Sequence, residues 1–222
     1  MWVNQGKLPR SFYENRDTLT VAAKLLGKRL VVPTPEGARV SGIIVEVEAY
    51  LGPEDKASHA YGHRQTTRNE AMYGPGGTVY IFFIYGMYFQ FNVVTNYELT
   101  PHAILVRALE PDEGIDLMRR RRGGNKKDRE LTSGPGKLCI ALGIDRSYNM
   151  DDLTGERMWI EKARRVTQRE IESGPRIGID YAEEYALMPW RFWLRDNVFV
   201  SGHRKSPKRP AISSARTPVL SN

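Results

Sequence analysis

Cysteine and histidine are scarce in this 222-residue chain, and their scarcity argues against several kinds of site. The single cysteine, Cys139, excludes an internal disulfide and leaves too few thiolates for a zinc site, which favours a reducing compartment. The four histidines show none of the spacings typical of metal ligands, such as H-E-x-x-H. We therefore expect no metal and no other cofactor.

Long apolar runs are also missing. Residues 1–10 lack the apolar segment of a signal peptide, and the most hydrophobic stretch, VYIFFIYGMYF at 79–89, is far shorter than the roughly 20 residues of a membrane helix. We expect an intracellular protein without membrane contact, in the cytoplasm or nucleoid, or in the nucleus of a eukaryote.

Acidic residues are fewer than basic ones, 26 against 33, which gives a formal net charge of +7 and a pI near 9.5. This balance favours nucleic acid, an anionic membrane or a phosphorylated partner without choosing among them, and a merely soluble basic protein also fits it. From residue 201 onward the chain has no acid. We expect an N-terminal arm at 1–12, one domain at 13–200 and a basic, disordered tail at 201–222.

The pattern of the chain predicts an α+β fold. Residues 18–26 read as a helix capped by Asp17 or Thr18, and residues 28–32 and 38–50 read as two antiparallel strands joined by a tight turn. A hairpin of two aromatic strands, 78–85 and 88–94, precedes a strand at 102–111. Further helices are expected at 112–122, 133–143 and 180–188, with short strands at 157–162 and 190–195. We expect a single compact domain built on a mostly antiparallel, curved sheet with flanking helices.

Two carboxylates stand two residues apart on the strand at 38–50. Residues two apart share a face of a strand, so Glu46, Glu48 and Tyr50 are expected on one side together with Ile44, and Val45, Val47 and their neighbours on the other. Paired carboxylates invite a carbohydrate-hydrolase reading with Glu46 and Glu48 as the pair. Neighbours on one strand point in parallel, however, so one catalytic acid with a structural companion fits better. An equally open alternative is that the two glutamates lie on a solvated strand face or pair with nearby Arg and Lys.

Two further features suit a nucleic acid. The sequence IYGMYF places bulky residues around Gly86, where a hairpin tip would expose them as wedges between bases, although most of these aromatics also fit a sheet core. The clusters MRRRRGG and NKKDR suit phosphate contact or a solvated helix end. SGPGK offers free N–H groups beside Lys137 for a phosphate oxygen, but it lacks P-loop spacing and gives no support to ATP-driven activity.

Several stretches in fixed order resemble the alkyladenine (3-methyladenine, or N-methylpurine) DNA glycosylase family. They are VEVEAYLGPEDKASH, RQTTRNEAM, YIFFIYGMYFQFN, ILVRALEP, DRELTSGPGKLCIALGI and RIGIDYAEEYA, and together they span roughly residues 12–200. The resemblance implies a compact α/β domain whose protruding hairpin enters the DNA minor groove. It also implies a damaged purine nucleotide that is flipped out and a hydrolysed N-glycosidic bond.

The resemblance also implies residue roles. Glu48 would be the general base that activates water, and Arg107 and the backbone carbonyl of Ile177 would help to hold that water. Tyr85 would fill the space that the flipped nucleotide leaves. The expected base-pocket residues are Tyr50, His59, Phe82 and Asn92, with Asn92 rejecting bases that carry an exocyclic amine. The expected DNA contacts are Arg64, Met87 and Lys137. At Phe82 a known family member has tyrosine, which puts the substrate range in question while leaving a ring for stacking.

These residues predict a monofunctional, base-excision-repair glycosylase acting as a monomer on double-stranded DNA that contains damaged purines. Alkylated purines are the expected substrates, with deaminated and etheno purines as further candidates. The matched pocket motifs contain no lysine for a Schiff base, so the strand should not be cut. The alternative is a non-catalytic protein of the same fold that binds damaged DNA.

Overall fold

The longest strand, β2 (Arg39–Leu51), lies at the centre of the sheet and carries the two carboxylates. In the computed structural model, which describes residues 6–202, β5 (His102–Glu113) runs along one edge of β2. The other edge is shared by β1 (Arg29–Pro33), paired with the first half of β2, and β8 (Arg191–Leu194), paired with the second half. Backbone partners on both edges explain why this stretch is an interior strand.

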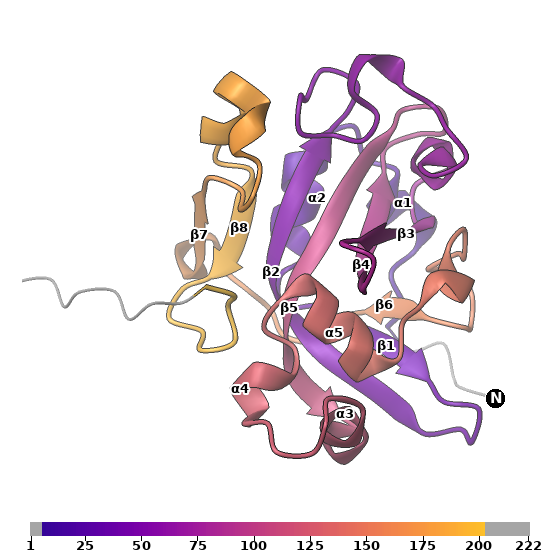
Figure 1. The fold of residues 1–222 in the computed structure, drawn as a ribbon, viewed down its shortest axis with the longest axis vertical. Coiled ribbons are helices and arrows are strands. Elements are labelled where there is room, and N and C mark those ends of the chain that lie inside the picture. The colour runs from indigo at the N-terminus through magenta and orange to yellow at the C-terminus, as the bar shows by residue number, and fades with distance from the viewer. Residues whose placement is uncertain (1–5, 203–222) are drawn as a thin grey trace, which may run out of the picture.

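The remaining strands extend this sheet in an antiparallel order, β3-β4-β5-β2-β1-β6, with β7 added beside β8 (Figure 1). β3 (Val79–Ile84) and β4 (Tyr88–Thr95) form the predicted hairpin. β6 is Trp159–Glu161 and β7 is Ile171–Gly174. The mostly antiparallel sheet with separate helices, in a single compact domain, confirms the predicted α+β class.

A bulge in β2 changes which side chains share a face. The register with β5 shifts between Ile44 and Glu46 and again between Glu46 and Val47. Ile44 therefore packs in the same core cluster as Val45 and Val47, and the expectation that it shares the face of the glutamates is wrong. An extra residue in one strand moves the side chains before it to the opposite face. A sequence pattern in which side chains simply alternate between the two faces cannot predict this.

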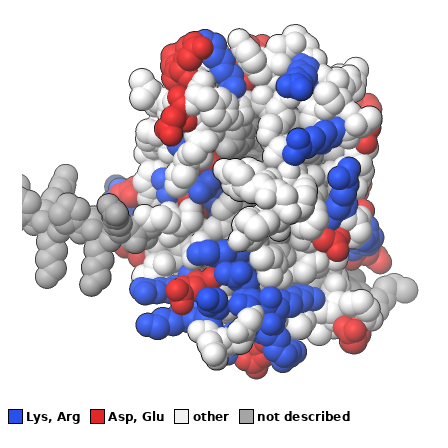
Figure 2. Space-filling view, viewed as in Figure 1, with Lys and Arg blue, Asp and Glu red and all other residues white. Residues whose placement is uncertain are grey.

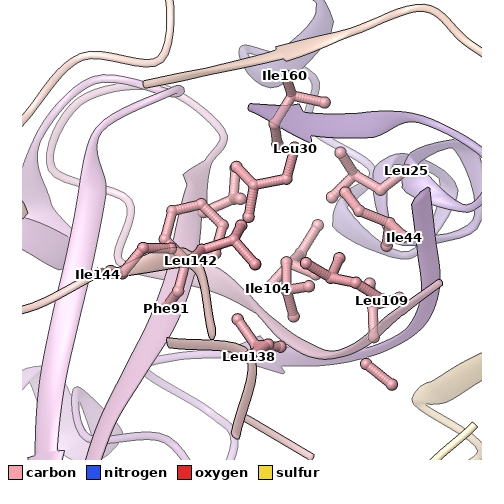
Figure 3. Close-up of a cluster of buried hydrophobic side chains, with 14 of the residues drawn as sticks. Leu25, Leu30, Ile44, Phe91, Ile104, Leu109, Leu138, Leu142, Ile144 and Ile160 are labelled. Carbon is pink, nitrogen blue, oxygen red and sulfur yellow. The ribbon is translucent and has the colours of Figure 1, made fainter. Parts of the chain in front are cut away.

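Helices cover the sheet where their apolar faces require it. α2 (Thr18–Leu25) begins at Asp17, whose carboxylate accepts the Thr20 N–H at 3.0 Å, as expected from the sequence. α5 (Pro135–Leu142) ends at Gly143, with a φ of +74°. Figure 3 shows Leu138 and Leu142 of α5 in the main core with strand residues such as Leu30 and Phe91. The other helices are α1 (Arg10–Tyr13), α3 (Ile115–Arg121) and α4 (Asp128–Leu131).

Two of the predicted helices differ from the structure. The helix expected from residue 112 begins only at Ile115, because β5 continues to Glu113 and Gly114 then turns the chain with a φ of +72°. Residues Asp180–Leu187 form 3-10 turns, η5, and Glu183 has a φ of +51° inside them, so the expected α-helix at 180–188 is wrong. Helical spacing of apolar residues does not distinguish α from 3-10 geometry over so short a segment.

The ends of the described chain pack on the domain. Leu8 and Tyr13 are buried. The backbone of Lys7 forms an antiparallel β-bridge with Glu161 at the end of β6. At the other end, Ser201 is buried, although it is the first residue of the predicted tail. The rest of that tail from residue 203, like residues 1–5 of the arm, lies outside the described residues. Within residues 6–202, no helix is both long and apolar enough to cross a membrane.

Candidate active site

A cavity of about 260 Å³ opens between the β3–β4 hairpin, the neighbouring parts of β2 and β5, and the loop 177–181. It brings together most of the residues that the sequence predicts for the site. Those that line it are Tyr50, His59, Tyr85, Asn92, Arg107 and Ile177. A groove of about 350 Å³ adjoins the cavity and shares His59, Tyr80 and Tyr181 with it.

Glu48 is fully buried and is bonded to three residues that line the cavity. Its Oε1 accepts the backbone N–H of Ile177 at 2.7 Å, and its Oε2 accepts the Tyr50 hydroxyl at 3.0 Å and Arg107 Nη1 at 3.1 Å. A carboxylate has roughly four acceptor positions. The three contacts leave one position, on Oε1, where a water molecule could be held and deprotonated.

Arg107 of β5 connects this carboxylate to the second glutamate. Its Nε donates to Glu46 Oε1 at 3.0 Å while Nη1 donates to Glu48. Burial alone would lower the pKa of Arg107, but the carboxylates of Glu48 and Glu46 raise it above its ordinary value. Arg107 is therefore a fixed cation between two buried anions.

Glu46 has its own set of donors away from the cavity. Arg191 Nε donates to Oε1 at 2.7 Å, and Ser201 donates its hydroxyl to Oε1 at 2.9 Å and its backbone N–H to Oε2 at 2.6 Å. Its side chain is fully excluded from solvent. The two glutamates of β2 thus have different hydrogen-bond partners. Because both are buried, the alternative of a solvated strand face is wrong for both.

Tyr50 forms one wall of the cavity and stays protonated. Burial, and then the neighbouring charge of Glu48, raise the pKa of its hydroxyl well above the ordinary value, so the group remains a donor to Glu48. The guanidinium of Arg176 lies 4.7 Å from the centre of the Tyr50 ring. This contact and the hydrogen bond keep the ring in a single orientation.

His59 stands at the mouth of the cavity, where part of its ring is exposed. Its Nδ1 lies 2.9 Å from the Tyr80 hydroxyl, and its ring stacks on Phe82 with the centres 4.0 Å apart. Burial of the ring against these neighbours, and then the charges of Arg68 and Arg64, lower the pKa of His59 from 6.5 to about 4. At neutral pH the cavity therefore faces a neutral imidazole.

The family comparisons agree with this geometry. A family model described as Methylpurine-DNA glycosylase (MPG) matches residues 11–198. A Chlamydia abortus protein is 51% identical over 191 residues, which cover 84% of this chain and 97% of the relative. A Desulfitobacterium hafniense protein is 48% identical over 202 residues, 88% of this chain and 98% of the relative. Both relatives are named "Putative 3-methyladenine DNA glycosylase".

The chain belongs to the methylpurine-DNA glycosylase family. Membership confirms the family predicted from the sequence motifs, and with it a role in DNA repair and a DNA substrate. All the motifs, which run from residue 45 to residue 186, lie within the matched segment.

The hairpin of this methylpurine-DNA glycosylase family member presents its tip at the cavity mouth. Tyr85 and Gly86 both have positive φ, +55° and +66°, and Met87 donates its N–H to Ile84 O at 3.2 Å. Such a turn matches the twist of the paired strands. Tyr85 is 82% exposed and Met87 66%. Tyr85 thus exposes its ring, although its backbone has a conformation that is uncommon for a residue other than glycine.

Asn92 of β4 is locked by its own strand neighbours. Its Nδ2 donates to the carbonyl oxygens of Tyr80 at 3.0 Å and Gln90 at 3.2 Å, so both amide hydrogens are used. The amide lines the cavity and cannot rotate away without breaking these bonds. Any exclusion of an exocyclic amine there would be steric, because the group left to face a base is an acceptor oxygen.

Five predicted residues do not line the cavity: Glu48, which is buried next to its wall, Met87 at the hairpin tip, and Phe82, Arg64 and Lys137. Phe82 lies behind His59, in the adjoining groove, where the Arg68 guanidinium is 4.5 Å from its ring centre. Arg64 lines the same groove and is exposed, and Lys137 is exposed on the first turn of α5. Their roles on DNA stay predictions. For Ile177, the observed contact with Glu48 uses the N–H, and the role of its carbonyl also stays a prediction.

Sequence reasoning missed three residues that lie next to the predicted site residues, Asp55, Tyr80 and Arg176. Arg176 and Asp55 form a buried ion pair, with distances of 2.5 and 2.8 Å, next to the Ile177 contact. Tyr80 lines both the cavity and the adjoining groove. Its place two residues before Phe82 on the same strand was the signal that could have identified it. In the described part of the chain, no cluster of His, Cys, Asp or Glu side chains could hold a metal ion.

Proposed function

We propose that the protein flips an alkylated purine nucleotide out of duplex DNA and hydrolyses its N-glycosidic bond. The observation that carries this proposal is the carboxylate of Glu48, which is buried behind the wall of a cavity beside an exposed hairpin tip and is held by three donors that line this cavity. A cavity of about 260 Å³ suits one flipped base but not a duplex. Deaminated and etheno purines are further candidate substrates for the same cavity.

The chemistry follows from the free acceptor position on Glu48. Glu48 orients a water molecule and takes one of its protons while the water oxygen bonds to C1′ of the sugar. The bond between C1′ and the purine nitrogen breaks, and its electron pair leaves with the base. An alkylated purine that carries a positive charge becomes neutral in this step, so it needs no acid to leave. The negative charge of Glu48 also stabilises the positive charge that develops on the sugar.

The walls of the cavity support the recognition of a purine. Tyr50 offers a ring for stacking, and neutral His59 avoids repulsion of a cationic base at the cavity mouth. Asn92 limits the shape of the base through its locked amide. We assign Phe82 an indirect role, because it supports His59 from the adjoining groove instead of stacking on the base.

The absence of a nucleophilic amine supports a monofunctional enzyme. Among the described residues that line the cavity, none is a lysine, and Arg107 remains protonated. No Schiff base with the sugar can form there. The product is therefore an abasic site in an uncut strand.

A basic surface near α3 and α4 supports binding to the DNA backbone. Figure 2 shows Lys and Arg side chains gathered over the lower part of the face, where Figure 1 has α3 and α4. Arg120, Lys126 and Arg129 of this region are exposed and form no ion pair with a described residue. The chain then leads from α4 to Pro135, which lines the cavity. We assign Tyr85 as the group that enters the stack and these cations as phosphate contacts.

The test compares wild-type protein with Glu48→Gln. We expect wild-type protein to release free methylated purine from dimethyl-sulfate-treated duplex and to leave alkali-sensitive abasic sites. Glu48→Gln should lose roughly 10²–10⁴-fold in single-turnover rate, the usual contribution of a general base. Binding to a duplex that contains a tetrahydrofuran abasic analogue should stay nearly unchanged.

Glu113→Gln is the matched control, because Glu113 is a paired carboxylate at the far end of β5. Normal excision by Glu48→Gln would contradict the assignment of the base. Tight binding without any base release by wild-type protein would favour the non-catalytic alternative instead.

A further inference from the structure

Glu46 is placed to act on the chemistry without touching the substrate. It is fully buried, does not line the cavity, and accepts four hydrogen bonds from Arg107, Arg191 and Ser201. A buried carboxylate is costly unless donors satisfy it, and this one has a full set. Its contact with Arg107 Nε is the only one of the four that leads to a residue of the cavity wall.

The guanidinium of Arg107 is held at all three of its nitrogens. Nε donates to Glu46 at 3.0 Å, Nη1 to Glu48 at 3.1 Å and Nη2 to the Ser201 hydroxyl at 3.3 Å. A planar group bonded at three points in its plane cannot rotate without losing a bond. Glu46 and Ser201 therefore decide how Arg107 meets the carboxylate of Glu48.

Ser201 completes this arrangement from the end of the domain. Its hydroxyl donates to Glu46 and accepts from Arg107, its N–H donates to Glu46, and its carbonyl accepts Arg191 Nη2 at 3.2 Å. The family match stops at residue 198, so Ser201 lies beyond the matched segment. One small residue thus contacts three of the four charged groups around the site.

The charges balance within this group. Glu46 and Glu48 contribute two negative charges, and Arg107 and Arg191 contribute two positive charges. Without Glu46, Arg107 would keep Glu48 as its one carboxylate partner and would be drawn toward the group that must accept a proton from water. Sharing Arg107 between two carboxylates leaves the free acceptor position of Glu48 available.

We propose that Glu46 and Ser201 are positioning residues that set the geometry of Arg107 against the catalytic base. The inference rests on the proposed function, since it concerns the same reaction. It assigns a reaction role to the second glutamate of the β2 pair and to a serine outside the matched family segment.

The main test is Ser201→Ala in the full chain, which removes one hydroxyl and keeps the backbone contact with Glu46. We expect the single-turnover rate on dimethyl-sulfate-treated duplex to fall about tenfold, equivalent to one lost charge-assisted contact in the transition state. Affinity for the tetrahydrofuran duplex should not change. Ser41→Ala is the matched control, because Ser41 is also buried and donates to a carboxylate, Glu113, at 2.7 Å away from the cavity.

Two further variants separate positioning from stability. Glu46→Asp keeps the charge and should retain more activity than Glu46→Gln, measured well below each unfolding midpoint. In an Arg107→Lys background, Ser201→Ala should cost nothing more, because lysine lacks the third nitrogen that contacts Ser201. Equal rates for Ser201→Ala and Ser41→Ala, or full additivity with Arg107→Lys, would overturn the inference. A wild-type protein that releases no base would instead contradict the proposed function.

Discussion

Asp55 and Arg176 form an ion pair from which solvent is excluded on both sides. Arg176 Nη1 and Nη2 lie 2.5 and 2.8 Å from the two oxygens of Asp55, and Nη1 also donates to the Ala49 carbonyl at 2.9 Å. Because Ile177 follows Arg176 directly, this pair fixes the backbone N–H that binds Glu48. The loop after β2 and the loop after β7 are thus joined next to the carboxylate of Glu48.

Replacing Asp55 by Asn should therefore destabilise the fold strongly. The substitution leaves the buried cation of Arg176 without its partner, which typically costs about 3–5 kcal/mol in the free energy of unfolding. Urea denaturation would measure the loss. Glu183→Gln is the control, since it breaks an ion pair with Lys56 on the exposed surface and should leave the unfolding midpoint nearly unchanged. A similarly small effect for both variants would contradict the structural role of the pair.

Local patterns predicted the parts of the site that lie on single elements. The alternation of β2 identified Glu46 and Glu48, and the glycine in IYGMYF identified the hairpin tip with Tyr85. The cap at Asp17 and the glycine at 143 also marked true helix ends. In each case the determining interactions are between residues a few positions apart, which a sequence displays directly.

The rest depends on contacts between distant segments. Glu46 meets Ser201 across 155 positions, and Asp55 meets Arg176 across 121, so no local pattern indicates either pair. The bulge after Ile44 arises from pairing with β5 and reverses the face of that residue. Charged residues in a sequence are expected at the surface, and only the fold shows that Glu46, Asp55 and Arg176 are buried.

Tyr85→Ala should slow excision while leaving stability unchanged. The ring is 82% exposed, so few folded-state contacts are lost. A stacked aromatic ring contributes about 1–3 kcal/mol to binding of a base, which corresponds to a loss of roughly 5- to 150-fold in single-turnover rate if the ring supports the flipped state. Tyr97→Ala, at another exposed tyrosine, is the control. Unchanged single-turnover kinetics for Tyr85→Ala would count against a wedge.

The pKa of His59 predicts how stability depends on pH. In the folded protein this pKa is lowered from 6.5 to about 4, so between these values the unfolded chain binds a proton that the folded chain does not. Stability should therefore decrease as the pH falls from 6.5 to about 4, and this contribution should be absent in His59→Gln. Denaturation at several pH values would measure it, with His63→Gln as the exposed control. Parallel pH curves for wild type and His59→Gln would refute the assignment.

The basic surface near α3 and α4 predicts the salt dependence of DNA binding. Replacing Arg120, Lys126 and Arg129 by Gln removes three exposed cations, and each phosphate contact contributes about 0.9 to the slope of log K against log salt. The slope should therefore fall by up to about 3 for any duplex, damaged or not, while the excision rate of bound substrate stays the same. The matched control replaces Lys162, Arg165 and Arg169, which are exposed and unpaired among the described residues, on the segment that contacts Gly27 after α2. An equal decrease in slope for both triple variants would mean that net charge alone, and not this surface, attracts the DNA.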